Sequence, residues 1–201
     1  MARDTNATIN SYITDMLALE DHIEKAVKGQ LTDLKDYPEV LAELRQFHRK
    51  IEHHVSDLRI LSDRRNAGGV VESVKRAGAA VAGAAAGLID LLRTEGLPKN
   101  LRDDYTAFNL ASVSYAMLHT TALALDDQDV AELSLQHYRD YTETVLQLNK
   151  LIPAAVVRSL QQNGLPARDE AVQLANQHVQ DAWRQTSSAA PIREPVSSRQ
   201  I

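Results

Sequence analysis

The chain has 201 residues, of which 44% are hydrophobic but only 4% aromatic, a length that suits one domain or one domain with an appendage. It contains no cysteine, which excludes disulfide bonds, thiolate zinc sites and cysteine nucleophiles. The net charge is −5, and the 22 basic and 27 acidic residues are mixed along the chain, so no basic stripe is present and nucleic-acid binding is not expected.

The first two predicted elements are long amphipathic helices. The first begins at a cap provided by Thr5 or Asn6 and runs to about Lys28, with apolar residues at three- and four-residue steps. The second begins at Pro38, where a first-turn proline is tolerated, and runs to about Arg65. The short connection between them predicts an antiparallel hairpin.

The following segment is rich in glycine and alanine. Residues 70–94 contain Gly78, Gly83 and Gly87 among many alanines, and we interpret them as a short, closely packed helix. The spacing of Gly83 and Gly87 would let another helix approach closely, within the subunit or across a dimer. With its flanks, the segment 66–97 is long enough to travel the length of a helical bundle, so a crossover connection is predicted.

The second half of the chain predicts another hairpin and a C-terminal extension. A third helix is expected over about 99–125, and Asp126 and Asp127 cap a fourth that ends near Ile152, where Pro153 should break or bend it. An amphipathic helix is expected over 166–186. The tail 187–201, with two prolines and four serines, is predicted to be disordered.

The order and lengths of these elements predict an all-α fold. Four long helices of similar length favour a bundle, and the order hairpin, long crossover, hairpin is the ferritin-like pattern. We therefore expect residues 1–165 to form a four-helix bundle with C-terminal helices appended. The N-terminal residues 1–6 show no secretory signal, and no run of about 18 apolar residues could span a bilayer. A cytoplasmic protein without membrane contact is predicted.

Polar residues interrupt the apolar stripes. Glu20 lies between Met16 and Ile23 on the core face of the first helix, and a buried carboxylate is unfavourable unless it is paired or bound to a metal ion. One interpretation is a structural hydrogen bond from Glu20 to His48, His54 or a tyrosine hydroxyl. The other is that Glu20 is a metal ligand.

Three stretches carry a resemblance to a known superfamily: Leu17–Ile23 in the first helix, Phe47–His54 in the second and Leu110–Tyr115 in the third. Over roughly residues 7–150 the chain resembles the ferritin-like superfamily and, within it, the YciE/YciF-type stress proteins. The resemblance implies two iron or manganese ions held in the bundle. The ligands would be one glutamate from each of two helices and a Glu-x-x-His pair from each of the other two.

The residues at the matching positions depart from that ligand set. Glu20 matches the first glutamate, and Glu52 matches the glutamate of the second-helix pair, but the residue three positions on is Val55. Between Thr106 and Leu125 there is no acidic residue, and none of the seven histidines follows an acidic residue by three positions. Hard divalent ions need several carboxylates, so a dinuclear centre is not expected.

Two reversed pairs leave a different possibility open. His54-x-x-Asp57 and His137-x-x-Asp140 lie on the second and fourth helices, and with Glu20 they could bind one iron or zinc ion. The alternative is that they are ordinary histidine–aspartate neighbours at helical spacing. The candidate metal ligands are therefore Glu20, Glu52, His54 and His137, although no metal or other cofactor is predicted.

These observations predict a non-catalytic ferritin-like protein with a degenerate metal site. It would have a structural or stress-associated role and act through self-association, as a homo-oligomer, or through a protein partner. The alternative is a metal-binding ferritin-like oxidoreductase or iron-handling protein with an atypical set of iron or zinc ligands.

Overall fold

A computed structural model describes residues 4–32, 34, 37–66 and 96–187, and these residues form five helices. The helices are α1 (Thr5–Gln30), α2 (Pro38–Asn66), α4 (Leu97–Ala124), α5 (Gln128–Gln162) and α6 (Glu170–Ser187). The predicted all-α class is confirmed. The predicted Gly/Ala-rich crossover and nearly all of the predicted C-terminal tail lie outside the described residues.

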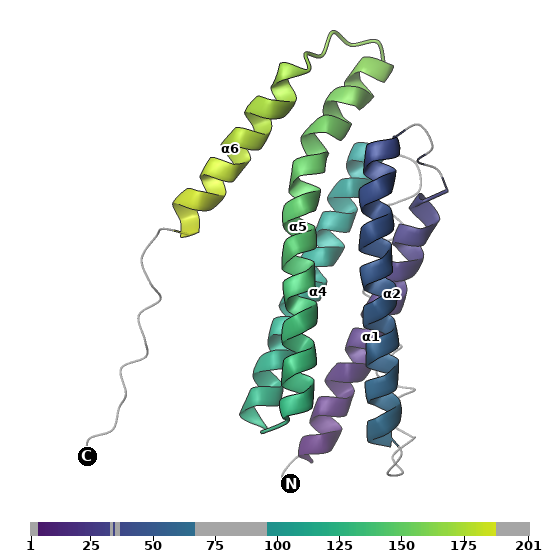
Figure 1. The fold of residues 1–201 in the computed structure, drawn as a ribbon, viewed down its shortest axis with the longest axis vertical. Helices are drawn as coiled ribbons and strands as arrows, with labels where there is room; N and C mark the ends of the chain where they lie inside the picture. The colour runs from purple at the N-terminus through teal and green to yellow at the C-terminus, as the bar shows by residue number, and fades with distance from the viewer. Residues whose placement is uncertain (1–3, 33, 35–36, 67–95, 188–201) are drawn as a thin grey trace, which may run out of the picture.

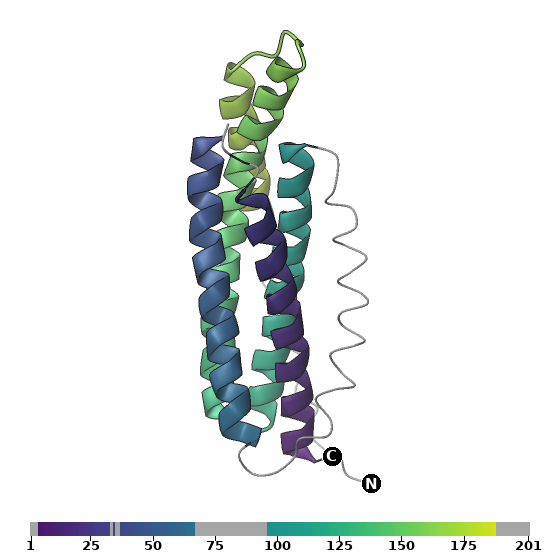
Figure 2. The ribbon, with the colours of Figure 1, turned by 90° about the vertical axis from the view of Figure 1, so that its right-hand side faces the viewer.

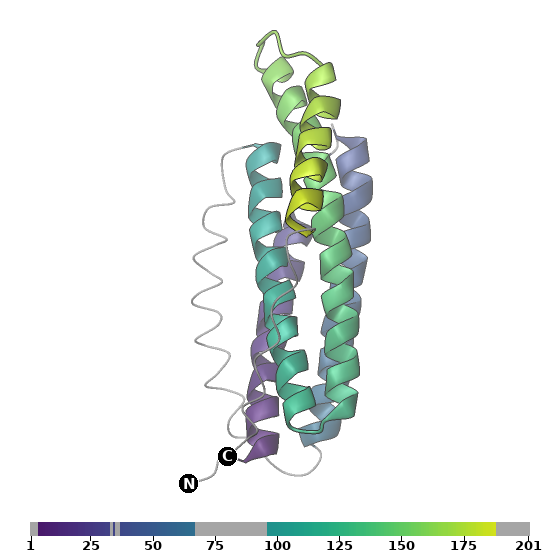
Figure 3. The same cartoon turned by 90° about the vertical axis from the view of Figure 1, so that its left-hand side faces the viewer.

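Helices α1, α2, α4 and α5 form a bundle in which neighbouring helices run antiparallel (Figure 1). Contacts join α1 to α2, α4 to α5, α1 to α4, and α2 to α5. Figure 2 shows α1 and α2 in front of α4 and α5, and Figure 3 shows the opposite side, where α6 turns back beside α5. Both predicted antiparallel hairpins are confirmed.

The N-terminus of α1 is capped one residue earlier than predicted. The side chain of Asp4 accepts a hydrogen bond from the backbone N–H of Asn6 at 3.0 Å, which satisfies an amide that has no partner within the helix. Thr5 is already helical and cannot be the cap. The predicted cap of α5 is confirmed, since the Asp127 carboxylate accepts from the N–H of Val130.

Helix α5 continues through Pro153, so the predicted end of this helix near Ile152 is wrong. Proline removes one backbone donor, but the amides that follow it are free to resume the helical pattern. Ala155 and Val157 beyond it are buried, which shows that the second part of the helix is held by packing. The helix ends at Gln162 with Asn163 as its C-cap, and Gly164 follows with a φ of 76°, a conformation that favours glycine.

The core of the bundle is built almost entirely of aliphatic side chains. One aromatic contact, between Phe47 and Phe108, joins α2 to α4 with ring centroids 5.9 Å apart and the rings nearly perpendicular. The apolar stripe predicted for the first helix is buried, including Ile9, Ile13, Met16, Ile23 and Val27. Among the described helices, none combines the length and apolar character needed to cross a membrane.

Candidate functional site

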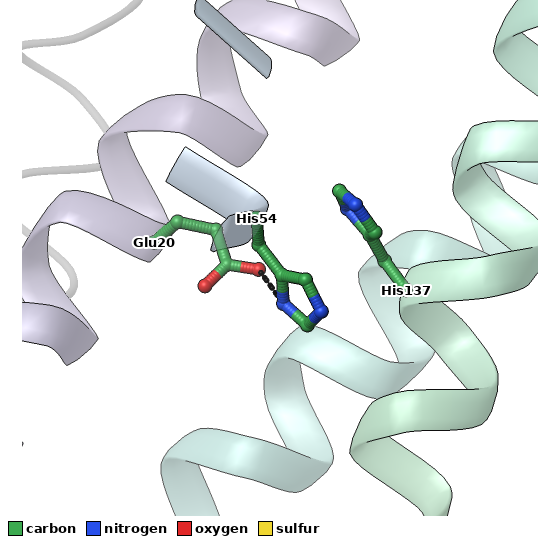
Figure 4. Close-up of side chains that lie close together, drawn as sticks. All are labelled: Glu20, His54 and His137. Atoms are coloured by element: carbon green, nitrogen blue, oxygen red, sulfur yellow. Dashed lines mark hydrogen bonds and ion pairs between the residues drawn. The ribbon is translucent and has the colours of Figure 1, made fainter. Parts of the chain in front are cut away.

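A cluster of polar side chains is buried in the middle of the bundle, and Glu20 of α1 lies at its centre. The carboxylate is fully buried and has three partners from three other helices. The hydroxyl of Tyr115 donates to Oε1 at 2.6 Å, and the hydroxyl of Tyr141 donates to Oε2 at 2.6 Å. Nδ1 of His54 lies 3.2 Å from Oε1 (Figure 4). Of the predicted alternatives for the partner of Glu20, His54 and a tyrosine hydroxyl are both found, whereas His48 contacts Glu24 instead.

His54 bridges two carboxylates. Its Nδ1 faces Glu20, and its Nε2 lies 3.2 Å from Oδ2 of Asp140 on α5. A carboxylate is only an acceptor, so both ring nitrogens must carry protons to make both bonds. Burial lowers the pKa of His54, but the hydrogen bonds and charges of Glu20 and Asp140 outweigh it and raise the pKa above its usual value of 6.5. His54 is thus an imidazolium flanked by two anions.

His137 occupies a similar position but is neutral. Its ring stacks on that of His54 with centroids 4.0 Å apart. Burial, followed by the positive charge of His54, lowers the pKa of His137 to about 3. Nε2 lies 3.2 Å from Oδ2 of Asp57 and Nδ1 lies 2.9 Å from the hydroxyl oxygen of Tyr115.

The hydrogen bonds of His137 and Tyr115 show which atoms of the cluster carry protons. The Asp57 carboxylate can only accept, so the single proton of neutral His137 belongs on Nε2. Nδ1 therefore presents a lone pair to the Tyr115 hydroxyl, whose only proton is already donated to Glu20. The Tyr115 hydroxyl therefore faces two buried acceptors, Glu20 Oε1 and His137 Nδ1, and of these only Glu20 Oε1 has a further donor, His54 Nδ1. While Tyr115 donates to Glu20, the Nδ1 lone pair of His137 receives no proton, which is unusual for a buried polar atom.

The two reversed pairs predicted from spacing meet across the bundle. Because α2 and α5 are antiparallel, His54 on α2 faces Asp140 on α5, and His137 on α5 faces Asp57 on α2. Each motif thus supplies a histidine to the cluster and a carboxylate to the histidine of the other. The i, i+3 spacing places both side chains of a motif on the same helix face.

Three of the four predicted metal-ligand candidates come together in the structure. Glu20, His54 and His137 each present one possible ligand atom, and these three atoms lie within 4.8 Å of one another (Figure 4). Glu52 does not join them: its side chain is 52% exposed and lies 3.4 Å from Nδ1 of His48. Glu52 is therefore excluded from the buried cluster, because the α2 face that carries it points toward solvent.

A second group with potential ligand atoms, Glu24, His48 and Glu52, lies nearer the surface of α1 and α2. Nε2 of His48 is 2.8 Å from Oε1 of Glu24, and Lys28 lies 3.4 Å from the same oxygen. Glu24 therefore already has a cationic neighbour. We interpret this group as a partly exposed ion-pair network, a common arrangement on helix surfaces.

Asp104 is a buried acidic residue that the sequence reasoning missed. It is 3% exposed, and its Oδ1 accepts a hydrogen bond from Nε2 of Gln30 at 2.8 Å. Burial, opposed by the hydrogen bond from Gln30 and assisted by the charge of Asp103, raises the pKa of Asp104 from its ordinary value of 3.8 to about 7. The helical register could have revealed it, since Asp104 lies three residues after Leu101 and four before Phe108, both of which are buried.

The residues of the cluster do not fit a dinuclear centre. Glu20 is the only carboxylate at the centre of the described bundle, whereas Asp57 and Asp140 bind the outer nitrogens of the two histidines. Tyr115 and Ala111 occupy the buried face of α4 where a second glutamate would be needed. Two divalent ions would lack bridging and neutralising carboxylates. The donor set of two imidazoles and one carboxylate does fit a single transition-metal ion.

The cluster lies close to a hollow that opens between α2 and α5. This hollow has a volume of about 580 Å³ and is lined by Asp57 together with Leu61, Arg64, Glu132 and Gln136. Asp57 accepts from His137 on its inner side, so it connects the buried cluster to the hollow.

Comparison with known proteins does not extend this description. No known protein family, curated protein or solved structure matches the chain. The described residues form an all-helical bundle of five helices with a buried cluster of glutamate, histidine and tyrosine. The chemistry of that cluster is the strongest guide to function.

Proposed function

We propose that this protein is a ferritin-like bundle that binds one transition-metal ion, iron or zinc, through Glu20, His54 and His137. The observation that carries the proposal is the lone pair of His137 Nδ1, which is buried, faces the cluster and competes with Glu20 for one proton. A bound cation would interact with both acceptors at once. Two imidazoles and a carboxylate form a donor set suited to zinc or iron.

The surroundings of the two histidines support the same proposal. Histidines that bind metal ions usually donate their second ring N–H to a carboxylate, which fixes the ring and raises its basicity. Asp140 takes this role for His54 and Asp57 takes it for His137, each at 3.2 Å. Neutral His137 is ready to bind, whereas His54 would release the proton that now faces Glu20.

The spacing of the ligand atoms requires only a small adjustment. Bonds from iron or zinc to nitrogen and oxygen are about 2.0–2.2 Å, so ligand atoms on one ion lie about 3–4 Å apart. The three candidate atoms lie within 4.8 Å of one another. A movement of about 0.5 Å by each side chain would bring them to bonding distance, which rotation about side-chain bonds can supply.

The helix arrangement supports the ferritin-like part of the proposal. Every neighbouring pair in the bundle is antiparallel, and the two hairpins each contribute two helices. This is the arrangement expected when two hairpins are joined by a crossover that runs the length of the bundle. The residues that would form the crossover lie outside the described part of the chain.

Metal analysis of the purified protein tests the proposal. Protein from cells supplied with iron and zinc should retain about one ion per chain by mass spectrometry of the metal content, and His137→Gln should lose it while keeping its helical circular dichroism. Glu52→Ala is the matched control, since Glu52 lies outside the cluster. Wild-type protein that holds no ion after incubation with either metal would contradict the proposal.

A second candidate function is a non-catalytic, structural or stress-associated role through self-association. The supporting observation concerns helix α4. Residues 105–125, which include most of this helix, contain no aspartate, glutamate, lysine or arginine, and apolar side chains are exposed on its outer face. On this outer face the exposed fractions of Leu110, Val113 and Met117 are 43%, 59% and 50%. Large exposed apolar side chains gathered on one face of an uncharged helix are typical of a protein–protein contact, so a second copy of the chain is a suitable partner for this face.

Light scattering distinguishes this second candidate. The wild-type protein should have the mass of a dimer or larger oligomer, and Val113→Glu should convert it to a monomer because a charge would be buried at the interface. Ile60→Glu, on an exposed position of α2, is the control and should leave the mass unchanged. A monomeric wild-type protein would rule out self-association through α4.

A further inference from the structure

We infer that Tyr115 is a fourth, anionic ligand of the proposed site and that this ligand makes Fe³⁺ the preferred ion. The inference rests on the proposed function and specifies which ion the site takes. It follows from the position of the Tyr115 hydroxyl, which contacts two of the three proposed ligand atoms.

The hydroxyl oxygen of Tyr115 lies between Glu20 and His137. It is 2.6 Å from Oε1 of Glu20 and 2.9 Å from Nδ1 of His137. Atoms bound to one ion lie about 3–4 Å apart, because each metal–ligand bond is about 2.0–2.2 Å, and both distances are shorter than that separation. An ion bound to Glu20 and His137 would therefore meet the tyrosine oxygen, which must either bind the ion or move away. Tyr115 is fully buried at the centre of the core and has little room to move.

The binding step balances without any other reactant. The O–H bond of Tyr115 and the N–H bond of His54 Nδ1 break, oxygen–iron and nitrogen–iron bonds form, and both protons leave to solvent. The neighbouring His137 and Asp57 lead toward the hollow between α2 and α5, and the Asp57 side chain is 26% exposed there. No change of oxidation state is involved when iron is supplied as Fe³⁺.

The charges around the site favour a trivalent ion. Glu20, Asp57, Asp140 and the Tyr115 phenolate place four negative charges on or next to the cluster once His54 has lost its proton. A buried charge is unfavourable without compensation, and a trivalent ion compensates more of these charges than a divalent ion does. Anionic oxygen donors such as carboxylate and phenolate suit a hard ion better than they suit a softer one.

Tyr141 provides an internal comparison within the same cluster. Its hydroxyl donates to Oε2 of Glu20, the carboxylate oxygen that is not shared with Tyr115 and His54. Tyr141 is buried, as Tyr115 is, and replacement of either tyrosine by phenylalanine removes only the hydroxyl group. It is therefore a positioning residue for the carboxylate, and Tyr141→Phe should weaken binding through Glu20 but keep the tyrosinate–iron bond of Tyr115.

Visible absorption of the iron-loaded protein tests the inference. Metal-free full-length protein is titrated with ferric nitrilotriacetate, and binding is followed by the phenolate-to-iron charge-transfer band and by tyrosinate vibrations in resonance Raman spectra. Wild type and Tyr141→Phe should show the band. Tyr115→Phe should lose the band, and its Fe³⁺ affinity should fall by about tenfold or more.

The outcomes separate this inference from the proposed function. If wild type binds Zn²⁺ or Fe³⁺ but shows no charge-transfer band, Tyr115 is not a ligand and the inference is overturned while the three-ligand site stands. If the band survives in Tyr115→Phe, the assigned tyrosine is wrong. If wild type binds neither ion, both the site and the inference are rejected.

Discussion

The charge of Glu20 is held by side chains from three other helices. Tyr115 and Tyr141 donate one hydrogen bond to each carboxylate oxygen, and His54 adds a positive charge. Each of these partners is itself buried. Removing Glu20 therefore leaves Tyr141 and the charged His54 without their acceptor, whereas Tyr115 can donate to His137 Nδ1 instead. An unpaired buried charge is far more unfavourable than an unpaired surface charge.

Glu20→Ala should lower the free energy of unfolding by about 3–5 kcal/mol, the effect of breaking a buried pair by removing one partner. Urea denaturation of the metal-free protein measures the change. Glu52→Ala removes an exposed carboxylate, so it should alter the free energy by no more than about 0.5 kcal/mol. Equal stabilities of the two variants would show that the cluster contributes nothing to folding.

Gln30 and Asp104 form a buried pair with two unsatisfied atoms. The amide nitrogen of Gln30 donates to Oδ1 of Asp104, but Oε1 of Gln30 and Oδ2 of Asp104 have no hydrogen-bond partner. A proton on Oδ2 would let the carboxyl group donate to Oε1 of Gln30 and satisfy both atoms. Burial raises the pKa of Asp104 to about 7, which agrees with a carboxyl group that keeps its proton in the folded chain.

Asp104→Asn should stabilise the protein at pH 8 and change little at pH 4. The folded pKa of about 7 lies above the ordinary value of 3.8, so the stabilising contribution of Asp104 is complete below pH 3.8 and is lost as the pH rises through 7. Asparagine can make the same two hydrogen bonds at any pH. We expect a gain of about 1–3 kcal/mol at pH 8 by urea denaturation. A variant less stable than wild type at pH 8 would refute the protonated pair.

At the scale of single helices, α5 keeps its helical conformation through an internal proline. Pro153 lies inside a helix that continues to Gln162, with Ala155 buried beyond it. Proline in a helix interior is less favourable than alanine by about 3 kcal/mol, because one hydrogen bond is lost and the ring crowds the preceding turn. Burial of the following turn on the bundle offsets this cost.

Pro153→Ala should raise the free energy of unfolding by about 1–3 kcal/mol, since alanine restores the backbone donor. Pro38→Ala is the matched control: Pro38 is the first residue of α2, where no intrahelical donor is required, and its replacement should be neutral or slightly destabilising. Thermal or urea denaturation compares the two. A loss of stability in Pro153→Ala would mean that the proline geometry itself is needed for the packing of α5.

The sequence predicts the helices well because their apolar residues recur at helical spacing. The stripes of α1 and α2 and the breaks at Gly96 and Gly164 are strong local signals. The end of α5 was mispredicted because a local rule for proline does not include the tertiary packing of Ala155 and Val157. The cap of α1 was displaced by one residue, since Asp4, Thr5 and Asn6 are all good capping residues.

The candidate site could be predicted only in part. Glu20 and the two His-x-x-Asp motifs are visible in the sequence as polar residues on or beside apolar stripes. Their reciprocal pairing depends on the register between α2 and α5, which is set by packing and not by either helix alone. The sequence makes Glu52 a candidate metal ligand because it matches a glutamate position of the ferritin-like superfamily. In the structure its side chain is exposed, which keeps it out of the buried cluster.

At the scale of the whole molecule, the two hairpins contribute to the cluster in a nearly symmetric way. Each hairpin supplies one His-x-x-Asp motif, and the carboxylate of each motif binds the histidine of the other hairpin. The two outer bonds have the same length of 3.2 Å. If the site binds a metal ion as proposed, both carboxylates should contribute to its affinity.

Asp57→Asn and Asp140→Asn should each weaken metal binding by about 10–100-fold, because loss of a carboxylate next to a metal-binding histidine reduces its basicity and its fixed orientation. Competition with a chelator of known affinity measures both variants. Asp21→Asn, which removes a surface partner of Arg59, is the control and should bind as wild type does. A strong effect in only one of the two variants would show that a single histidine dominates the site.

The interactions of Glu20 also constrain the order in which the chain folds. Its bond to His54 closes within the first hairpin, whereas the bonds to Tyr115 and Tyr141 join residues 95 and 121 positions apart and require the two hairpins to meet. Contacts between such distant positions form slowly because long loops must close first. Substitution of either tyrosine by phenylalanine should therefore accelerate unfolding more than it slows refolding. Stopped-flow measurement of both rates would show whether the α1–α2 and α4–α5 hairpins dock late in folding.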